Sequence, residues 1–195
     1  RVLQFAPLHF DACIEEIFMT LGAGAHLCIA PETVKHSFAA FFTFCDDHHI
    51  SLLDLPTAYF NEMLFASGGE QTLPPAVTTV IIGGESLSPR AKERWFAHYP
   101  KGRKLFNSYG PTETTVVATA AEIKNDGAAV TIGTPLDGIY TAIVGEDLRP
   151  LPLGCSGELL IAGATVGLGY WHQPTLSAEK FVTLEANGHL MPAFR

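Results

Sequence analysis

A short run of hydroxyls with one carboxylate is the stretch of this sequence best suited to nucleotide chemistry. In "NSYGPTETT" (107–115), a Gly-Pro pair predicts a tight turn after a strand, and Thr112 and Glu113 follow it directly. Hydroxyls and backbone N–H groups can hold phosphate oxygens, and one carboxylate is enough to anchor a Mg²⁺ ion that also carries phosphates and waters. Tyr109 offers a flat face on which a base can stack. Each residue alone also fits an ordinary strand–turn–helix junction, but the whole run fits that alternative poorly.

Two carboxylates stand four residues apart in "FDACIEEIF" (10–18), which has the apolar spacing of an amphipathic helix. At about 100° per residue, Asp11 and Glu15 lie about 40° apart, along one margin of the apolar stripe. The simplest alternatives are a helix cap for Asp11 and a surface position for Glu15, because repulsion at this spacing costs only a few tenths of a kcal/mol. Glu16 points almost directly away and is expected to be a solvated charge. The stripe consists of Ile14, Ile17, Phe18 and Leu21.

The elements that must position these residues alternate between helical and strand patterns over the first two-thirds of the chain. Apolar or β-branched runs separated by helices indicate βαβ units and a parallel sheet. From about Ala128 the pattern changes to short strands broken by Gly and Pro, which indicates antiparallel pairing. The sequence therefore predicts an α/β fold, with a parallel sheet flanked by helices over residues 1–127 and a smaller antiparallel β subdomain over 128–195. Helices are expected at about 11–22, 32–48, 57–66 and 86–99, and strands at about 50–56, 77–85 and 103–111.

Each predicted strand of the α/β part ends in a polar or glycine cluster. Asp54 closes the first strand, residues 83–85 (Gly-Gly-Glu) close the second, and residues 107–110 (Asn-Ser-Tyr-Gly) close the third. In open parallel sheets, ligands bind outside the carboxyl ends of the strands. The three ends are therefore predicted to form one binding site, where bare glycine backbone lets a ligand approach closely.

The composition is that of a globular protein with enough apolar residues for a real core. Of 195 residues, 47% are hydrophobic and 16% are charged, so the chain is not disordered. The net charge of −8 argues against nucleic acid as a partner, and no apolar run has the length of a membrane span or the features of a signal peptide. The four cysteines form no C-x-x-C pair and are expected to be small buried residues of a reducing, cytoplasmic compartment. They are Cys13, Cys28, Cys45 and Cys155.

Five motifs resemble, in their order and approximate spacing, the adenylation domains of nonribosomal peptide synthetases, which belong to the adenylate-forming superfamily. The resemblance extends from Val2 to about Phe181. The Tyr-Gly-Pro-Thr-Glu string is highly specific for the superfamily, and the Phe-Asp pair at 10–11 resembles its amino-acid-activating branch. The motifs are "FDACIEEIF", "GGESLSP", "NSYGPTETT", "IGTPLDG" and "GELLIAGATVGLGYWHQPTLSAEKF".

The resemblance implies an ATP-dependent ligase. The carboxylate of an amino acid would attack the α-phosphate of ATP to give an aminoacyl-adenylate and pyrophosphate. The aminoacyl group would then pass to the phosphopantetheine thiol of a separate peptidyl carrier domain, with a condensation domain in the same synthetase. Such chemistry needs positioning and charge neutralisation more than a covalent nucleophile.

The resemblance also implies roles for the residues that match the family motifs. Tyr109 would stack on adenine, and Asn107 would hydrogen-bond its amine. Thr112 would contact phosphate and Glu113 would bind Mg²⁺, and these two are the expected catalytic residues. Asp11 would hold the α-ammonium group of the substrate. The wider ATP-binding set is Gly83, Gly84, Glu85, Asn107, Ser108, Tyr109, Gly110 and Thr112.

The family's selectivity positions, carried over to this sequence, give a substrate pocket with two extra carboxylates. Once the α-ammonium group occupies Asp11, Glu15 and Asp54 remain in a partly apolar pocket, where unpaired carboxylates are costly. A side-chain cation relieves that cost, so a basic amino acid is predicted, lysine first and ornithine or arginine next. The alternative is a neutral amide such as glutamine. The lining would be Phe10, Asp11, Ala12, Glu15, Asp54, Ile81, Gly83, Ser108, Val116 and Val117.

The sequence departs from the family pattern in several places. Ala164 and Leu168 stand where the family usually has Gly and Arg. The phosphate-binding loop, the ribose-binding segment and the C-terminal lysine of the family are absent, so the chain is expected to be a piece of a longer polypeptide that does not catalyse adenylation alone. Two other functions stay open. One is an acyl- or aryl-CoA ligase, whose substrate has no α-ammonium group for Asp11 to bind. The other is a non-catalytic scaffold, against which the intact nucleotide-binding residues argue.

Overall fold

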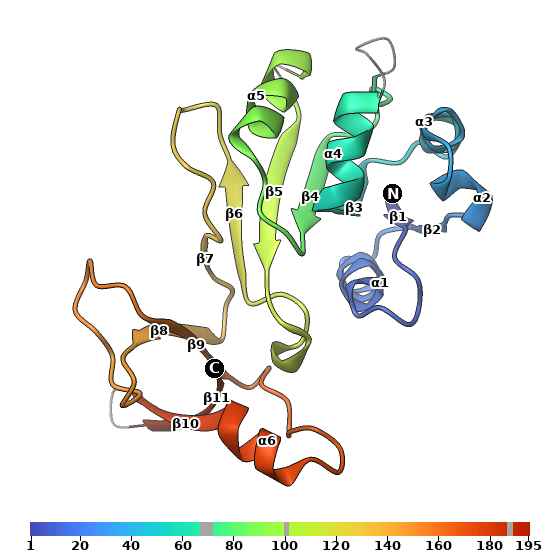
Figure 1. Ribbon diagram of the computed structural model, residues 1–195. Helices are drawn as coiled ribbons and strands as arrows, with labels where there is room; N and C mark the ends of the chain where they lie inside the picture. The colour runs from blue at the N-terminus through green and yellow to red at the C-terminus, as the bar shows by residue number, and fades with distance from the viewer. Residues whose placement is uncertain (67–71, 100–101, 187–188) are drawn as a thin grey trace. The chain divides into compact units, whose positions relative to one another are not determined.

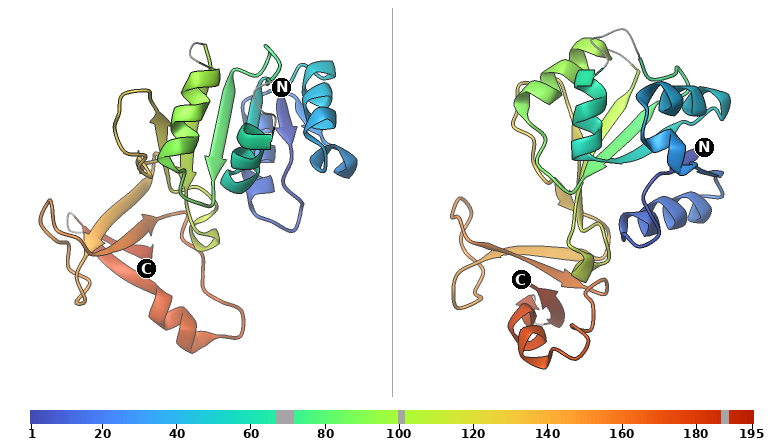
Figure 2. Two further views of the ribbon diagram at one scale, coloured as in Figure 1. Left: turned by 45° about the horizontal axis from the view of Figure 1, so that its top comes forward. Right: turned by 45° about the vertical axis from the view of Figure 1, so that its right-hand side comes forward.

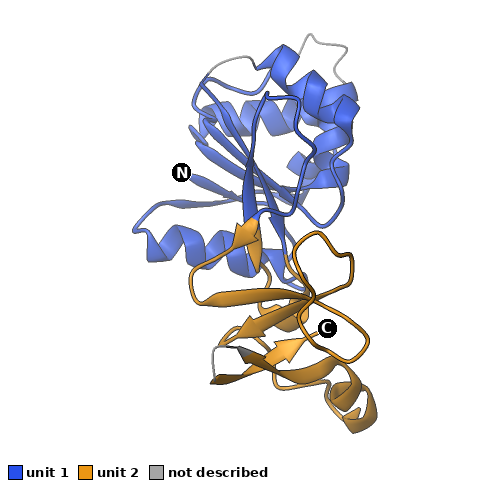
Figure 3. Ribbon diagram, turned by 90° about the vertical axis from the view of Figure 1, so that its left-hand side faces the viewer, with its two compact units in different colours: residues 1–109, 120–133 blue, residues 110–119, 134–195 orange. Residues whose placement is uncertain are grey.

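A computed structural model describes residues 1–66, 72–99, 102–186 and 189–195 of the chain (Figure 1). The chain divides into two compact units, which Figure 3 shows in different colours. Unit 1 comprises residues 1–109 and 120–133, and unit 2 comprises residues 110–119 and 134–195. The domain boundary expected between residues 127 and 128 stays a prediction.

Unit 1 is built on a largely parallel sheet. Its strands are β1 (Val2–Gln4), β2 (Leu27–Ile29), β3 (Leu52–Pro56), β4 (Thr79–Gly83), β5 (Lys104–Tyr109) and most of β6 (Thr119–Ile123). The strand order is β2-β1-β3-β4-β5-β6, and the pairs from β2 to β5 are parallel. The helices are α1 (Ala12–Gly22), α2 (Glu32–Lys35), α3 (Phe38–Asp47), α4 (Thr57–Ala66) and α5 (Pro89–His98). The predicted parallel α/β architecture is confirmed, although the stretch 32–48 forms two helices instead of one.

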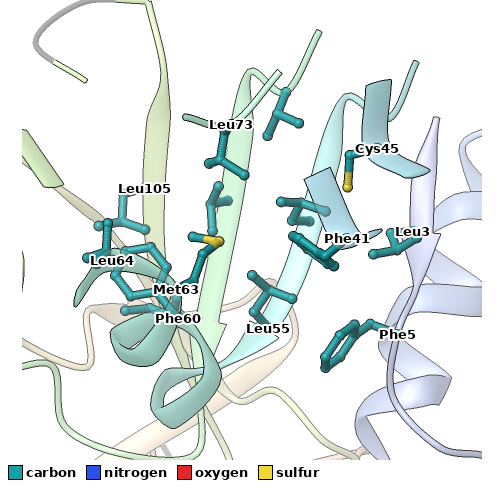
Figure 4. Packing of buried hydrophobic residues seen from close by; sticks show 14 of the residues in the cluster. Leu3, Phe5, Phe41, Cys45, Leu55, Phe60, Met63, Leu64, Leu73 and Leu105 are labelled. Atoms are coloured by element: carbon teal, nitrogen blue, oxygen red, sulfur yellow. The ribbon is translucent and has the colours of Figure 1, made fainter. Parts of the chain in front are cut away.

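The main core lies between this sheet and the helices α3, α4 and α5, and Figure 4 shows its side chains from close by. Alternate side chains of a strand point to opposite faces, so Leu53 and Leu55 of β3 both enter this core. Helix α5 begins as predicted, because Ser88 Oγ accepts a hydrogen bond from Ala91 N and Pro89 takes the first helical position. The largest fully buried side chains include Phe41 of α3, Phe60 of α4, Trp95 of α5, and Leu3, Leu55 and Leu105 of the sheet.

Helix α1 is rotated relative to the prediction. Ile14, Phe18 and Leu21 were expected to face the core, but they are 41%, 67% and 59% exposed. The prediction was wrong because it counted apolar side chains and could not include the hydrogen-bond partners that make a polar side chain favourable inside. The buried side of the helix consists of Cys13, Glu16 and Thr20.

Unit 2 contains a small antiparallel sheet, which confirms the predicted change of strand pattern. Its strand order is β10-β11-β9-β8, and each neighbouring pair is antiparallel. Val144, Leu160 and Leu184 are buried together in a core of its own. The elements of this unit are the 3₁₀ helix η1 (Thr112–Thr114), β7 (Thr134–Pro135), β8 (Ile139–Val144), β9 (Glu158–Gly163), α6 (Pro174–Lys180), β10 (Phe181–Ala186) and β11 (His189–Phe194).

The cysteines agree with the prediction at three of their four positions. Cys13, Cys28 and Cys45 are buried free thiols, whereas Cys155 is exposed. The expectation for Cys155 was wrong because this residue lies between β8 and β9, outside both strands and their core. None of the described helices is long and apolar enough to cross a bilayer.

Candidate active site

The carboxyl ends of β1, β3, β4 and β5 meet at one edge of the unit 1 sheet, because these strands are parallel (Figures 1 and 2). The register pairs Asp54 of β3 with Ile81 of β4, and by alternation Gly83 lies on the same face as Ile81. A Cβ atom on Gly83 would come within 2.8 Å of Ser108 Oγ, so Ser108 approaches the same place from β5. Four residues predicted to line the substrate pocket are therefore neighbours, on the face opposite the core.

The Glu15 and Asp54 carboxyl groups meet on that face, close enough for each to shift the pKa of the other. Asp54 is 8% exposed, and its Oδ2 atom is buried without a hydrogen-bond partner in the described structure. Burial, first of all, raises the pKa of both groups, and the charges of nearby carboxylates raise both further. Within the described part of the chain, the neighbours that act on this pair are acids and no cation is among them. The pair is thus a buried acidic group that lacks a counter-charge.

The start of α1 carries three more of the predicted pocket residues, Phe10, Asp11 and Ala12. Asp11 stands at the N-cap position, but its side chain makes no capping hydrogen bond. Its charge raises the pKa of Glu15, which places the two carboxylates within electrostatic reach of each other. Phe10 is 58% exposed. The capping alternative for Asp11 therefore fails, and Asp11 and Glu15 lie on the same side of the helix.

Glu16 is a buried carboxylate that the sequence placed wrongly at the surface. It is 1% exposed, and its Oε1 atom accepts hydrogen bonds from Phe5 N at 2.9 Å and Ala6 N at 3.0 Å. Gln4 Nε2 donates to its Oε2 atom at 3.2 Å. Burial raises the pKa of Glu16, and the backbone donors partly offset this effect. The carboxylate joins α1 to the chain that leaves β1, and no local pattern could have revealed this because the donors lie ten or more residues away.

A cavity of about 280 Å³ lies at the ends of β4 and β5, entirely within unit 1. Asn107 Nδ2 donates to Thr131 O at 2.8 Å, and Tyr109 is 40% exposed at the end of its strand. Thr57, which the sequence did not indicate, donates from Oγ1 to Gly83 O and Glu85 O and fixes the turn after β4. The lining is Gly84, Glu85, Ser86, Leu87, Asn107, Ser108, Tyr109, Val130, Thr131 and Ile132.

The cavity lining includes five of the residues predicted to bind ATP, and Gly83 directly precedes the first of them. The contribution of residues 130–132 was missed, because the sequence pattern assigned this stretch to the second subdomain. It lies against β5 through the Asn107–Thr131 contact, which only the tertiary structure shows. The remaining two residues predicted to bind ATP, Gly110 and Thr112, belong to unit 2.

In unit 2, the segment after Gly110 presents the carboxylate of Glu113. Two neighbouring hydroxyls have structural partners, since Thr114 Oγ1 donates to Pro111 O and Thr115 Oγ1 donates to Thr165 O. Thr112 is exposed on η1 beside Glu113. One carboxylate with an exposed hydroxyl fits a Mg²⁺ ion carried by nucleotide phosphates, which needs only one or two protein carboxylates. The described residues contain no cluster of three or more His, Cys, Asp or Glu side chains that could hold a metal ion by themselves.

The two remaining predicted pocket residues follow η1 in unit 2. Thr115 and Val116 have φ values of 62° and 71°, and such a conformation is strained for a β-branched residue. A Cβ atom on Gly110 would lie 2.4 Å from Val116 O, so only glycine fits beside this turn. Val116 and Val117 are both half-buried. The strained turn sets the direction of their side chains.

We expect the Glu15–Asp54 pair to make the folded protein less stable as the pH rises. The pKa of Glu15 is raised from 4.5 to about 7, and that of Asp54 from 3.8 to about 9. The folded state therefore keeps protons that the unfolded state releases, and this contribution is lost between about pH 4 and pH 9. Thermal melting from pH 5.5 to 9.5 should show a steeper fall for the wild type than for Asp54→Asn, which keeps the shape but cannot ionise. Parallel curves would contradict the prediction.

The chain is similar to known proteins in both sequence and structure. The chain matches the family described as AMP-binding enzyme over residues 1–171. It is 40% identical to the isonitrile lipopeptide synthase of Streptomyces coeruleorubidus over 199 residues, covering 100% of this chain and 13% of that protein. In structure it is similar to the N-terminal subdomain of Klebsiella oxytoca NpsA in complex with 3-hydroxybenzoyl-AMSN, with a TM-score of 0.88 and 31% identity over 100% of this chain and 47% of the other.

A second solved structure places the similar region in a larger assembly. It is NpsA-ThdA, an artificially fused adenylation-PCP di-domain of a nonribosomal peptide synthetase from Klebsiella oxytoca. The TM-score is 0.87 at 30% identity, over 100% of this chain and 36% of that one. The chain thus spans less than half of each of the proteins and structures that it resembles here. On the match over residues 1–171 and these similarities, the chain belongs to the AMP-binding enzyme family and corresponds to a segment of the adenylation domains of nonribosomal peptide synthetases.

Proposed function

We propose that this chain forms part of the amino-acid-activating site of an ATP-dependent ligase, and that its substrate is a basic amino acid. Lysine is the first choice, and ornithine and arginine come next. The product is an aminoacyl-adenylate, formed with release of pyrophosphate, and the aminoacyl group then passes to the phosphopantetheine thiol of a carrier domain. A condensation domain of the same cytoplasmic synthetase would use the loaded carrier.

The Glu15–Asp54 pair is the observation that carries the choice of substrate. Among the described residues, this carboxyl pair has an unpartnered oxygen and no cation beside it, an arrangement that is costly without a counter-charge. A ligand ammonium or guanidinium group would supply the missing charge and donate to Asp54 Oδ2. A neutral amide could donate the hydrogen bond, but it would leave the negative charge uncompensated. Asp11, at the start of α1, would hold the α-ammonium group that every amino acid has.

The geometry around Asn107 supports adenine as the base. Its Nδ2 atom donates to Thr131 O, so its Oδ1 atom remains as the acceptor that a ligand can meet. Adenine offers an exocyclic amine donor to such an acceptor, whereas guanine offers an oxygen at the corresponding position. Tyr109 would stack on the ring. Glu85 and the glycine backbone at 83–84 would line the path of the nucleotide, next to Ser108.

In this reaction the chain would mainly position the two reactants and neutralise the charge of the phosphates. Thr112 would hold phosphate oxygens, and Gly110 would let the chain turn tightly beside them. Glu113 would bind the Mg²⁺ ion that enters with ATP and neutralises phosphate charge when it is bound. The carboxylate of the substrate would then face the α-phosphate, with its α-ammonium group fixed by Asp11. The half-buried Val116 and Val117 would form an apolar wall beside the aliphatic part of the side chain.

The test is amino-acid-dependent exchange of pyrophosphate into ATP by the full-length protein. We expect lysine to support the fastest exchange, followed by ornithine and arginine, with glutamine and leucine far behind. Equal exchange with leucine and lysine would overturn the proposed substrate class. Exchange supported by an aryl or fatty acid, but by no amino acid, would instead favour a CoA ligase. Absence of exchange with every acid would favour a non-catalytic scaffold.

A further inference from the structure

Tyr170 lies in the glycine-rich loop of residues 164–171, and its side chain contacts the carboxylate of Glu113 within unit 2. The Tyr170 hydroxyl donates a hydrogen bond to Glu113 Oε1. Glu113 is 57 residues away in the sequence, so this contact joins two otherwise separate segments. The hydrogen bond engages only one of the two carboxylate oxygens, so Tyr170 does not occupy the other, Oε2. Nothing in the sequence pattern had assigned a role to Tyr170.

Two further hydrogen bonds join the same two segments, one between backbone groups and one from a side chain to the backbone. Gly167 N donates to Glu113 O at 2.8 Å, and Thr115 Oγ1 donates to Thr165 O at 2.6 Å. A Cβ atom on Gly167 would lie 3.3 Å from Glu113 O, so a glycine at this position allows close approach. The backbone of Glu113 is therefore held by the loop independently of the Tyr170 hydroxyl.

Tyr170 is itself fixed by its surroundings. Its backbone N–H donates to Ser177 Oγ of α6 at 2.7 Å. Its ring packs edge-on against Phe181, with 5.3 Å between ring centroids, and Phe181 packs in the same way on Phe194. The hydroxyl takes no part in these two contacts, and the packing of the ring orients it toward Glu113.

We propose that Tyr170 is a positioning residue that holds the Glu113 carboxylate by one oxygen and turns the other toward the metal ion of the bound nucleotide. The proposal rests on the metal-binding role proposed for Glu113. Groups that hydrogen-bond a metal ligand commonly contribute 10- to 100-fold to metal affinity, because they fix the ligand's orientation. The loop of residues 164–171 thereby contributes to the nucleotide site through Glu113, without needing to touch the nucleotide itself.

The test removes only the hydroxyl, with Tyr170→Phe in the full-length protein. Mn²⁺ serves as a spectroscopic substitute for Mg²⁺, and its binding is followed by electron paramagnetic resonance with a non-hydrolysable ATP analogue. We expect Mn²⁺ affinity to fall about 10-fold, while binding of the analogue without metal stays unchanged. Tyr140→Phe, at an exposed tyrosine on β8 of the same unit, is the matched control and should change neither. Unchanged Mn²⁺ affinity, or an equal loss of metal-free binding, would overturn the proposal.

A second variant separates this proposal from the proposed role of Glu113. Glu113→Gln should weaken Mn²⁺ binding at least as much as Tyr170→Phe, and the double variant should be no weaker than Glu113→Gln alone. If Glu113→Gln leaves Mn²⁺ binding intact, the metal-binding role of Glu113 is wrong. If it abolishes binding but Tyr170→Phe has no effect, that role stands and the positioning role of Tyr170 is wrong. Additive losses in the double variant would likewise contradict a role that acts through Glu113.

Discussion

Replacing Glu15 with glutamine should reduce kcat/KM for lysine on the order of 10²-fold, because breaking a buried charged pair costs roughly 3 kcal/mol or more. The substitution keeps the shape of the side chain and removes the charge that would balance the substrate cation. Glu15 belongs to α1 and meets Asp54 of β3, whereas the predicted ATP contacts in unit 1 lie at the ends of β4 and β5. The KM for ATP should therefore stay nearly unchanged. Pyrophosphate exchange at varied lysine and varied ATP separates the two effects.

The control for this prediction is Glu93→Gln on α5. Glu93 is exposed and lies on a helix of the opposite, core-covered face, so its charge should not matter for lysine. We also expect Glu15→Gln to reduce the ratio of kcat/KM for lysine to kcat/KM for glutamine. In the variant, a bound glutamine substrate no longer leaves the charge of Glu15 unpaired. A fall in kcat/KM of similar size for every amino acid, or a raised KM for ATP, would show that Glu15 supports the fold and does not select the substrate.

Replacing Glu16 with alanine should lower the free energy of local unfolding, where α1 contacts the chain that leaves β1, by roughly 3 kcal/mol. The buried N–H groups of Phe5 and Ala6 lose their acceptor, and the side-chain amide of Gln4 loses one of its two acceptors. Each buried donor left without a partner costs about 1–3 kcal/mol. Amide hydrogen exchange at Phe5 and Ala6, measured in the full-length protein, should accelerate on the order of 10²-fold.

Two comparisons make this second prediction specific. Glu93→Ala, which removes an exposed glutamate from α5, should leave exchange at Phe5 and Ala6 unchanged. Glu16→Gln should show an intermediate effect, because an amide keeps one acceptor oxygen but turns an N–H group toward the remaining donor. If Phe5 and Ala6 exchange in Glu16→Ala at wild-type rates, the carboxylate does not stabilise the contact between α1 and the chain after β1.

The architecture could be predicted from the sequence because it depends on local patterns. Buried runs, serine caps and glycines after strands each occupy a few neighbouring residues, and they identified the parallel sheet and the carboxyl edge where Asp54 and Asn107 lie. The interior role of Glu16 could not be predicted, since it depends on donors brought in by another strand. The place of Thr131 beside Asn107 and the reach of Tyr170 to Glu113 depend in the same way on contacts between distant segments.

The alternation of side chains along β3 also bears on how such a pocket can change during evolution. Leu53 and Leu55 face the core, while Asp54 between them faces the other side of the sheet, where it meets Glu15. Neither Asp54 nor Glu15 belongs to the hydrophobic core, so, under the proposed function, a substitution at either position would change substrate selection without removing a core contact. If the pair selects the substrate as proposed, one or two substitutions would change the preferred amino acid while the sheet stays the same.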